Sequence, residues 1–210
     1  MGSLIAIIGA SGVGKTALVS ALAKTQADLS GNAIEVFETA FEQHAERPFQ
    51  SLFKEDMRYA LANQIDYYLF RAEQEKQLRA SPRLGLIDGG LDLDFHAFTH
   101  LFHHRQMLSD AEFDLCHRMY EFIREYLPRP ELLVHMNADE HTIARRLAMR
   151  NRINIARAED TALFNSFVDE WLATIPTDQI VELDVSDETL GYEKSVKVIL
   201  DKTRTFPTRL

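Results

Sequence analysis

Cysteine is nearly absent from this sequence, since Cys116 is the only one among 210 residues. No internal disulfide can therefore form, and a metal site built on thiolates is implausible. This use of cysteine fits a reducing compartment, and we expect the protein in the cytoplasm. The sequence also lacks an apolar run long enough for a signal peptide or a membrane span, because the first such run covers only residues 4–8. We therefore expect no membrane partner.

Positive charge is also scarce. The sequence has 23 lysine and arginine residues against 32 aspartate and glutamate residues, which gives a formal net charge of −9. Domains that bind nucleic acid through its phosphates are usually basic, so we expect no long nucleic acid as a partner. A small anionic ligand is compatible with this charge if local cations attract it.

The chain has no internal repeat and no linker rich in glycine, serine or proline. Its length suits one α/β domain, which we place over residues 1–210. Short apolar runs that predict strands alternate with longer stretches of helical composition. The expected strands cover residues 4–8, 33–37, 84–87, 132–136 and 180–185. The expected helices cover residues 16–24, 50–79, 94–105, 110–126, 139–150, 158–173 and 188–202.

This alternation predicts a parallel sheet of five strands with helices on both faces. In such sheets ligands bind beyond the carboxyl ends of the strands, so functional residues should directly follow the strands. Gly9, Glu38 and Asp88 follow the first three expected strands. We therefore expect the functional site at this edge of the sheet.

Residues 9–16 match the phosphate-loop pattern G-x-x-x-x-G-K-[ST] in full, between an expected buried strand and an expected helix. The glycines let successive backbone N–H groups face one point, and the helix N-terminus adds partial positive charge. Lys15 should reach the β- and γ-phosphates, and Thr16 should ligate Mg²⁺. The expected nucleotide-binding residues of this loop are Gly9, Ser11, Gly12, Val13, Gly14, Lys15 and Thr16. The loop therefore predicts a P-loop NTPase fold that binds ATP with Mg²⁺.

Asp88 ends the third expected strand and is the natural second acid on the magnesium side. A carboxylate at this place would lie beside the phosphate loop and hold Mg²⁺ directly or through water. The alternative is an aspartate that caps a helix or forms a turn before Gly89 and Gly90.

A phosphate loop alone does not distinguish kinases, GTPases and motor ATPases. The sequence has no Asn-Lys-x-Asp element of the kind that reads guanine in GTPases. It has instead an arginine cluster near residues 145–158, which we interpret as a lid. Arg146 and Arg150 are four residues apart and share a helix face, and Arg152 follows in an expected loop. These cations suit clamping of a transferring phosphoryl group, and the alternative is a solvated basic helix face.

In this order of motifs the sequence resembles the deoxyribonucleoside kinase family over nearly the whole chain. Members of that family have a glutamate after the second strand that serves as general base toward the sugar 5′-hydroxyl. The resemblance assigns this role to Glu38, with Glu35 and Glu42 as close competitors and a surface glutamate as the alternative. Such a base accepts the proton as the hydroxyl attacks the γ-phosphoryl group. The resemblance thus implies ATP-dependent phosphorylation of the 5′-hydroxyl of a nucleoside, above all a deoxynucleoside.

The resemblance also assigns residues that read the nucleobase. The family has a glutamine and an arginine seven residues apart on a long helix, and Gln64 and Arg71 keep that spacing. Six residues after the third-strand acid the family has an aspartate that pairs with the arginine, which here is Asp94. A bidentate Arg71–Asp94 pair would orient a planar set of donors and acceptors against a base. Phe98, one turn beyond Asp94, could stack on that base.

The last expected strand and its loop, residues 180–187, resemble the part of the family that cradles the adenine of ATP. The resemblance assigns Asp184 and Asp187 to that loop. Family members also form homodimers, and the helices around residues 50–79 and 110–126 could bury a shared face. A homodimer is therefore a candidate assembly.

Four positions depart from the family pattern. Gly89 and Gly90 stand where the family has Arg-Ser, so a cation that touches the phosphates and the general base is absent. Phe53 and Ile155 stand where the family holds the sugar 3′-hydroxyl with a tyrosine and a glutamate. Loss of both polar partners penalises burial of that hydroxyl. We therefore expect an altered substrate, or weakened activity on ordinary deoxynucleosides.

Two other functions are open at this point. A nucleoside monophosphate kinase of the thymidylate kinase type would want an arginine near Asp88, where glycines stand. A nucleotide-binding regulatory protein could keep the ATP site and lose catalysis.

The histidines at positions 96, 100, 103 and 104 lack an evident third metal ligand, so we interpret them as a surface histidine-rich helix.

Overall fold

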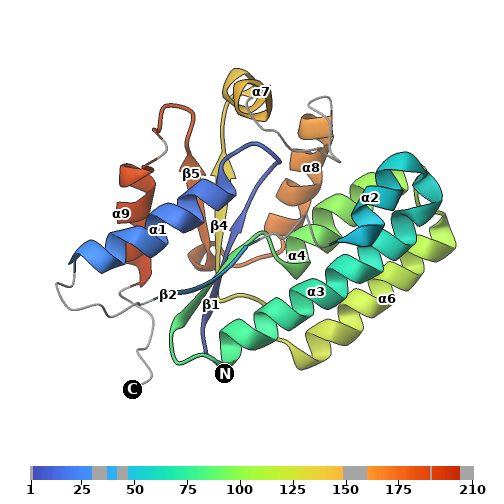
Figure 1. Cartoon of the computed structure of the whole chain (residues 1–210), viewed down its shortest axis with the longest axis horizontal. Helices are drawn as coiled ribbons and strands as arrows, with labels where there is room; N and C mark the ends of the chain where they lie inside the picture. The colour runs from blue at the N-terminus through green and yellow to red at the C-terminus, as the bar shows by residue number, and fades with distance from the viewer. Residues whose placement is uncertain (1, 30–36, 42–46, 149–159, 190, 204–210) are drawn as a thin grey trace.

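The computed structural model describes residues 2–29, 37–41, 47–148, 160–189 and 191–203. At the centre of this part of the chain lies a sheet of five parallel strands in the order β2-β3-β1-β4-β5 (Figure 1). The strands are β1 (Leu4–Ile8), β2 (Phe37–Ala40), β3 (Leu84–Asp88), β4 (Leu132–Asn137) and β5 (Ile180–Asp184). The parallel α/β fold expected from the alternating sequence pattern is thus confirmed.

β1 lies in the middle of the sheet, between β3 and β4. All of its residues are buried, and they alternate between the two faces of the sheet. Leu4, Ala6 and Ile8 join one apolar cluster, whereas Ile5 and Ile7 join the other. A continuous apolar run suits this central position because helices cover both faces.

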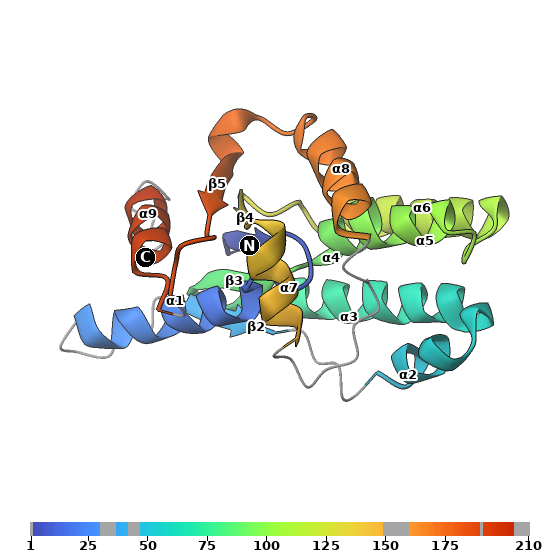
Figure 2. The same ribbon diagram turned by 90° about the horizontal axis from the view of Figure 1, so that it is seen from above.

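Helices form a layer on each face of the sheet, as the view from above shows (Figure 2). One face carries α1 (Lys15–Leu29) and α9 (Glu193–Thr203), which pack against Ile5 and Ile7. The other helical elements are α2 (Pro48–Glu55), η1 (Met57–Tyr59), α3 (Ala60–Ala80), α4 (Leu91–Leu93), η2 (Asp94–Thr99), α5 (His100–His104), α6 (Asp110–Tyr126), α7 (Glu140–Ala148), α8 (Thr161–Leu172) and η4 (Thr177–Gln179). Of these, α3, α4, α6 and α8 contribute to the cluster that contains Leu4. Among the described helices, none has the length and apolar character needed to cross a membrane.

The stretch expected as one helix over residues 50–79 is interrupted at Asp56, which corrects that prediction. The backbone of Asp56 is extended, and its carboxylate accepts the N–H of Arg58 with a distance of 2.9 Å. Aspartate is a strong helix start because its side chain satisfies an N–H that has no partner inside the helix. The chain therefore restarts at this point and continues through η1 into α3.

The segment expected as a helix over residues 94–105 contains a wider turn. η2 is a π-helix between α4 and α5. Thr99 Oγ1 donates to the carbonyl oxygen of Asp94, five residues earlier, with a distance of 2.9 Å. Such π-turns frequently occur at functional sites. The turn places Asp94 next to α3, where its side-chain partner lies.

Candidate active site

The loop between β1 and α1 has the backbone that phosphate binding requires. Gly9 and Gly14 have φ values of 137° and 111°, which side chains of L-residues rarely allow. Space is equally restrictive, since a Cβ on Gly14 would lie 1.9 Å from the Tyr192 hydroxyl. Lys15 Nζ donates to the carbonyl oxygens of Gly9 at 2.9 Å and Ala10 at 3.2 Å. The ammonium group therefore lies against the loop at the N-terminus of α1, where phosphates bind in such loops.

Thr16 and Asp88 meet beside this loop. Asp88 ends β3 and is paired with Ile7 of β1 in the sheet register. Thr16 Oγ1 donates to Asp88 Oδ2 at 2.5 Å. Asp88 is 1% exposed, and its Oδ1 has no hydrogen-bond partner among the described residues. An unpartnered buried carboxylate oxygen next to a hydroxyl suits Mg²⁺, which takes few protein oxygens and completes its shell with phosphate and water.

Arg146 extends from α7 to the phosphate loop. Its Nη1 donates to the carbonyl oxygen of Val13 at 2.6 Å, and its Nη2 donates to that of Val185 at 3.0 Å. Arg146 thus connects the loop with the turn after β5. The other two arginines expected in the lid, Arg150 and Arg152, lie outside the described residues.

The turn after β5, which the resemblance assigned to adenine binding, is folded by its own polar side chains. Asp184 Oδ1 accepts the hydroxyl of Ser186 at 2.6 Å and its N–H at 3.0 Å, and these bonds lower the pKa of Asp184. The N–H of Val185 donates to the carbonyl oxygen of Asn137 at 2.8 Å, which ties the turn to β4. Asp184 and Asp187 are both exposed. The turn therefore presents carboxylates on a backbone that is held in place.

Arg71 and Asp94 form a buried pair between α3 and η2. Arg71 Nε donates to Asp94 Oδ2 at 2.9 Å, and the two side chains are 2% and 6% exposed. Gln64 lies two turns before Arg71 on α3, and its amide nitrogen donates to Thr99 Oγ1 at 2.7 Å. The structure thus brings together the three residues that the resemblance assigns to the nucleobase.

Two further polar side chains belong to this group and were not among the sequence predictions. Tyr68 lies one turn after Gln64, and its hydroxyl oxygen is 2.5 Å from Thr99 Oγ1. Gln74 lies one turn after Arg71 and accepts its Nη1 at 3.0 Å. The sequence contains a signal for both, because residues three or four apart share a face of a helix. Burial raises the pKa of Tyr68 well above its ordinary value, so its hydroxyl stays protonated.

Phe98 and Phe53 pack within the apolar cluster of the same face. The Phe98 ring centroid lies 4.9 Å from that of Phe164 and 6.2 Å from that of Phe102. The Phe53 ring centroid lies 5.0 Å from that of Phe102. Core packing therefore holds both rings, and the stacking role expected for Phe98 stays a prediction.

Glu38 lies at a different place from the one that its expected role requires. The register pairs Glu38 with Gly85, three residues before Asp88. Glu38 Oε2 accepts the hydroxyl of Ser81 at 3.1 Å and Nη1 of Arg83 at 3.3 Å, and both residues precede β3. The strands are parallel, so these contacts hold the carboxylate near the amino end of the sheet. The structure therefore does not bring Glu38 to the phosphate loop.

The reason for this correction is the extent of the second strand. The sequence placed the strand over residues 33–37, so that Glu38 would directly follow it, whereas pairing with β3 continues to Ala40. Residues 33–36 lie outside the described part of the chain, as do the competitors Glu35 and Glu42.

Gly89 leaves space for Arg71. Its φ is 83°, and a Cβ on Gly89 would lie 2.9 Å from Arg71 Nη2. The resemblance implies an arginine at this position, whereas here the guanidinium group of Arg71 lies against the backbone next to Asp88. The turn after β3 therefore connects Asp88 with the Arg71–Asp94 pair. Ile155, the other departure in the lid, lies outside the described residues.

His96 and His100 are half-buried, whereas the sequence predicted a surface helix; His104 of the same segment is exposed. His96 stacks on Trp171 with ring centroids 4.9 Å apart, and its Nε2 is 3.2 Å from the Tyr120 hydroxyl. Burial lowers the pKa of His96 to about 3 and also lowers that of His100. The cause is tertiary, because α6 and α8 pack over η2. Within the described part of the chain, no cluster of three or more histidine, cysteine, aspartate or glutamate residues could hold a metal ion.

Comparison with protein families and curated proteins gives consistent matches. The family model for deoxynucleoside kinase matches residues 5–206. Deoxyadenosine kinase of Dictyostelium discoideum is 26% identical over 152 residues, which span 72% of this chain but only 58% of that relative. Deoxyadenosine/deoxycytidine kinase of Bacillus subtilis (strain 168) is 22% identical over 207 residues, which span 95% of this chain and 91% of that relative.

Solved structures share the fold. Deoxyadenosine kinase from M. mycoides, with the products dCMP and a flexible dCDP bound, has a TM-score of 0.77 at 18% identity and covers 97% of this chain and 100% of that chain. A structure of deoxyadenosine kinase from M. mycoides with bound dATP has a TM-score of 0.76 at 18% identity, over 96% of this chain and 100% of that chain. Because the family model covers nearly the whole chain, the protein is a phosphotransferase that belongs to the deoxynucleoside kinase family.

Proposed function

We propose that this chain transfers the γ-phosphoryl group of ATP to the 5′-hydroxyl of a deoxynucleoside, with Mg²⁺ held by Thr16 and Asp88. The observation that carries the proposal is the turn at Gly89. On one side of it Asp88 bonds to Thr16, and on the other Arg71 bonds to Asp94. An ion site for phosphates and a buried pair for a base are therefore neighbours, which suits in-line transfer between two held substrates.

Bound Mg²⁺ would neutralise charge on the phosphate oxygens. The chain itself supplies position and further charge. Lys15 and the N–H groups of the loop hold the phosphates, and the N-terminus of α1 adds partial positive charge. Arg146 donates to the carbonyl oxygens of Val13 and Val185 and so fixes the distance between the phosphate loop and the turn after β5. These contacts would give the triphosphate and the adenine one preformed surface, and we assign Asp184 to its adenine side.

The lid arginines Arg150 and Arg152 have the proposed role of contacting the phosphoryl group during transfer. Cations placed there would stabilise the negative charge that spreads over its oxygens in the transition state. Asp187 has the proposed role of contacting the adenine side of ATP. These three roles rest on the order of motifs in the chain.

A preformed set of polar side chains would read the base. Asp94 and Gln74 hold Arg71, and Thr99 holds Gln64. Side chains that are already held lose little freedom when a ligand binds, so they can recognise a planar base edge at low entropic cost. Both curated relatives are named for deoxyadenosine, and one is also named for deoxycytidine. We therefore propose deoxyadenosine as the first acceptor to test, followed by deoxycytidine.

The experiment is transfer of radiolabelled phosphate from ATP to the four deoxynucleosides and to dTMP. We expect transfer to at least one deoxynucleoside, and its loss when EDTA removes Mg²⁺. Transfer to dTMP alone would favour a thymidylate-type kinase. Thermal stabilisation by ATP with no transfer at all would favour a regulatory protein. Either of these last two results would overturn the proposed function.

Two matched variants test which glutamate is the general base. Removal of a general base lowers kcat by about 10²–10⁴-fold. The contacts of Glu38 with Ser81 and Arg83 predict that Glu38→Gln keeps most of the wild-type kcat. Glu42→Gln is the comparison, and a large loss of kcat is expected there. A large loss in Glu38→Gln alone would return the role of base to Glu38.

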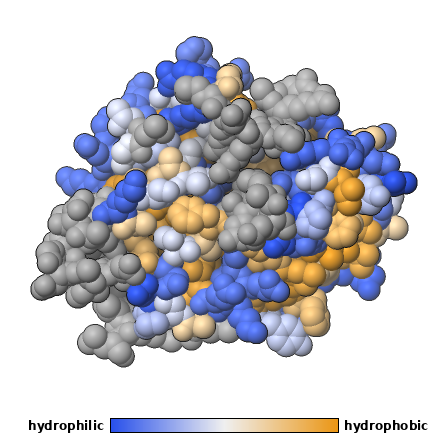
Figure 3. Space-filling view, viewed as in Figure 1, coloured by the Kyte–Doolittle hydropathy of each residue, from blue (hydrophilic) through white to orange (hydrophobic). Residues whose placement is uncertain are grey.

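We also propose that a second copy of the chain covers the outer side of α3 and α6. Leu69, Phe122 and Tyr126 are 52%, 60% and 65% exposed. Figure 3 shows apolar surface gathered on the side of the molecule where these helices lie. Exposed apolar groups that cluster in this way mark interfaces. Sedimentation tests this proposal: the wild type should be a dimer, and Phe122→Glu should be a monomer.

The proposed location is the cytoplasm, because the only cysteine, Cys116, is a buried thiol.

A further inference from the structure

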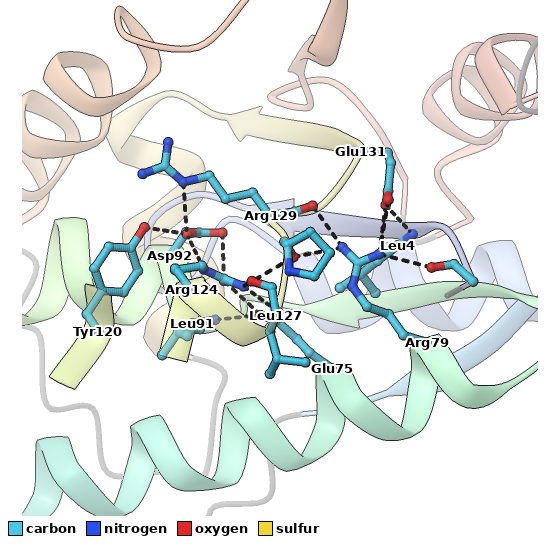
Figure 4. Close-up of polar contacts among 12 residues, drawn as sticks. Leu4, Glu75, Arg79, Leu91, Asp92, Tyr120, Arg124, Leu127, Arg129 and Glu131 are labelled. Atoms are coloured by element: carbon cyan, nitrogen blue, oxygen red, sulfur yellow. Dashed lines mark hydrogen bonds and ion pairs between the residues drawn. The ribbon is translucent and has the colours of Figure 1, made fainter. Parts of the chain in front are cut away.

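Arg124 of α6 lies buried against α3 and α4 and binds two carboxylates at once (Figure 4). Its Nη1 and Nη2 donate to the two oxygens of Glu75 at 2.7 and 3.0 Å. Its Nε and Nη2 donate to the two oxygens of Asp92 at 3.0 and 2.9 Å. Tyr120, one turn earlier on α6, donates its hydroxyl to Asp92 at 2.6 Å, and Glu75 also accepts the N–H of Leu91 at 3.3 Å. One guanidinium group thus joins three helices.

Burial makes this group sensitive to the loss of any member. Glu75 and Asp92 are 0% and 3% exposed. Burial alone would lower the pKa of Arg124, but Asp92 and Glu75 together raise it above its usual value, so the guanidinium stays charged. Removal of one partner from a buried ion group leaves uncompensated charge behind. Arg129 Nε lies 4.0 Å from Asp92 Oδ1, but Arg124 contacts both carboxylates and therefore holds them close together.

Both carboxylates are close in the chain to the pair that we assign to the base. Glu75 follows Arg71 by one turn of α3, and Asp92 precedes Asp94 by two residues. Arg124 binds the first carboxylate from α3 and the second from α4. It therefore fixes, relative to each other, the two backbone segments that carry Arg71 and Asp94.

We propose that Arg124 is a positioning residue for the deoxynucleoside. Through its bonds to Glu75 and Asp92 it sets the spacing of the Arg71–Asp94 pair. The kinetic part of this inference rests on the proposed function, whereas its structural part does not. A hydrogen bond weakens as its donor and acceptor separate, and a misplacement of about 1 Å can cost about 10²-fold in rate. Loss of the Arg124 contacts should therefore weaken nucleoside binding and leave ATP binding on the phosphate loop unchanged.

Arg79 offers a matched control on α3. Its side chain is 1% exposed, and it donates to Glu131 at 3.0 Å. It also donates to the carbonyl oxygens of Gly2 and Pro128, each at 2.9 Å. Arg79 lies eight residues after Arg71, near the end of α3 and the start of β1, as Figure 4 shows. A lysine at either position loses the forked contacts of a buried arginine, so both changes should lower stability alike.

The experiment compares KM for deoxyadenosine, KM for ATP, kcat and Tm in the wild type, Arg124→Lys and Arg79→Lys. We expect Arg124→Lys to raise the KM for deoxyadenosine about tenfold while the KM for ATP stays within about twofold. Arg79→Lys should change neither KM despite a similar loss of Tm. Tyr120→Phe removes the hydroxyl that donates to Asp92 and lies 3.2 Å from His96 Nε2, so it should fold and raise the KM for deoxyadenosine about threefold. An unchanged KM for deoxyadenosine in both Arg124→Lys and Tyr120→Phe would overturn the inference.

A second readout separates this inference from the proposed function. The Nε–Hε signal of Arg71, in protein labelled with ¹⁵N at arginine, reports its bond to Asp94 without any turnover. We expect this signal to shift in Arg124→Lys and to stay in place in Arg79→Lys. If it stays in place in Arg124→Lys, the inference fails even in an active enzyme. If it shifts while no deoxynucleoside is phosphorylated, the positioning role stands and the proposed function fails.

Discussion

Gly89→Ala places a methyl group against the guanidinium of Arg71. Gly89 has a φ of 83°, and a Cβ there would lie 2.9 Å from Arg71 Nη2. The neighbouring Gly90 has a φ of 117°, and a Cβ there would find its nearest described neighbour, Ile87 Cγ2, at 3.6 Å. Gly90→Ala is therefore a matched control. Both changes strain the backbone, but only the change at Gly89 displaces Arg71.

The magnitude follows from these distances. A side chain at a positive φ outside its favoured region costs about 1–3 kcal/mol, and both variants carry this cost. To reach an ordinary van der Waals distance, Arg71 Nη2 has to move away from the new Cβ by roughly 0.5–1 Å. The Arg71 Nε–Asp94 Oδ2 distance is 2.9 Å, and a hydrogen bond between charged groups contributes about 1.5–3 kcal/mol. Its loss corresponds to about a ten- to hundredfold weaker affinity for the base.

The assay is steady-state phosphorylation of deoxyadenosine, with Tm measured on the same preparations. Each kcal/mol of strain should lower Tm by about 2–4 °C in a protein of this size, in both variants. Gly89→Ala should raise the KM for deoxyadenosine about ten- to hundredfold and leave the KM for ATP unchanged. Gly90→Ala should leave both KM values unchanged. An equal rise in the two variants would assign the effect to strain in the turn, and no rise in Gly89→Ala would refute a role of Arg71 in holding the nucleoside.

Two further predictions concern titratable groups. Burial lowers the pKa of His96 to about 3, against about 6.5 in an unfolded chain, so between these values the unfolded state binds a proton that the folded state excludes. The free energy of unfolding should therefore fall as pH drops from about 6.5 toward 5, by at most about 1.4 kcal/mol per unit. Urea titrations of His96→Gln should show a shallower dependence, and equal slopes would contradict this account. Burial also raises the pKa of Cys116 to about 11. At mildly alkaline pH a thiol reagent should therefore react far more slowly with the native protein than with the urea-unfolded chain. Equal rates would contradict the burial of this thiol.

Several features of this protein could be predicted because neighbours in the chain determine them. The glycines of residues 9–16 permit the backbone of a phosphate loop wherever a buried strand meets a helix. Gln64 and Arg71 share a face of α3 because seven residues complete about two turns. Local spacing therefore indicated the phosphate loop and the order of elements, whereas the role proposed for Gln64 and Arg71 came from the family resemblance.

Other features depend on contacts that no local spacing encodes. Strand register decides where Glu38 lies, and register is set by the packing of side chains between β2 and β3. Arg124 meets Glu75 and Asp92 from 49 and 32 residues away. Gly89 reads in sequence as a missing cation, whereas the fold shows the guanidinium of Arg71 lying against it. The sequence by itself determined which chemical groups the site could use, because motifs are local. Only the tertiary structure decided which groups meet, because burial and packing act between segments far apart in the chain.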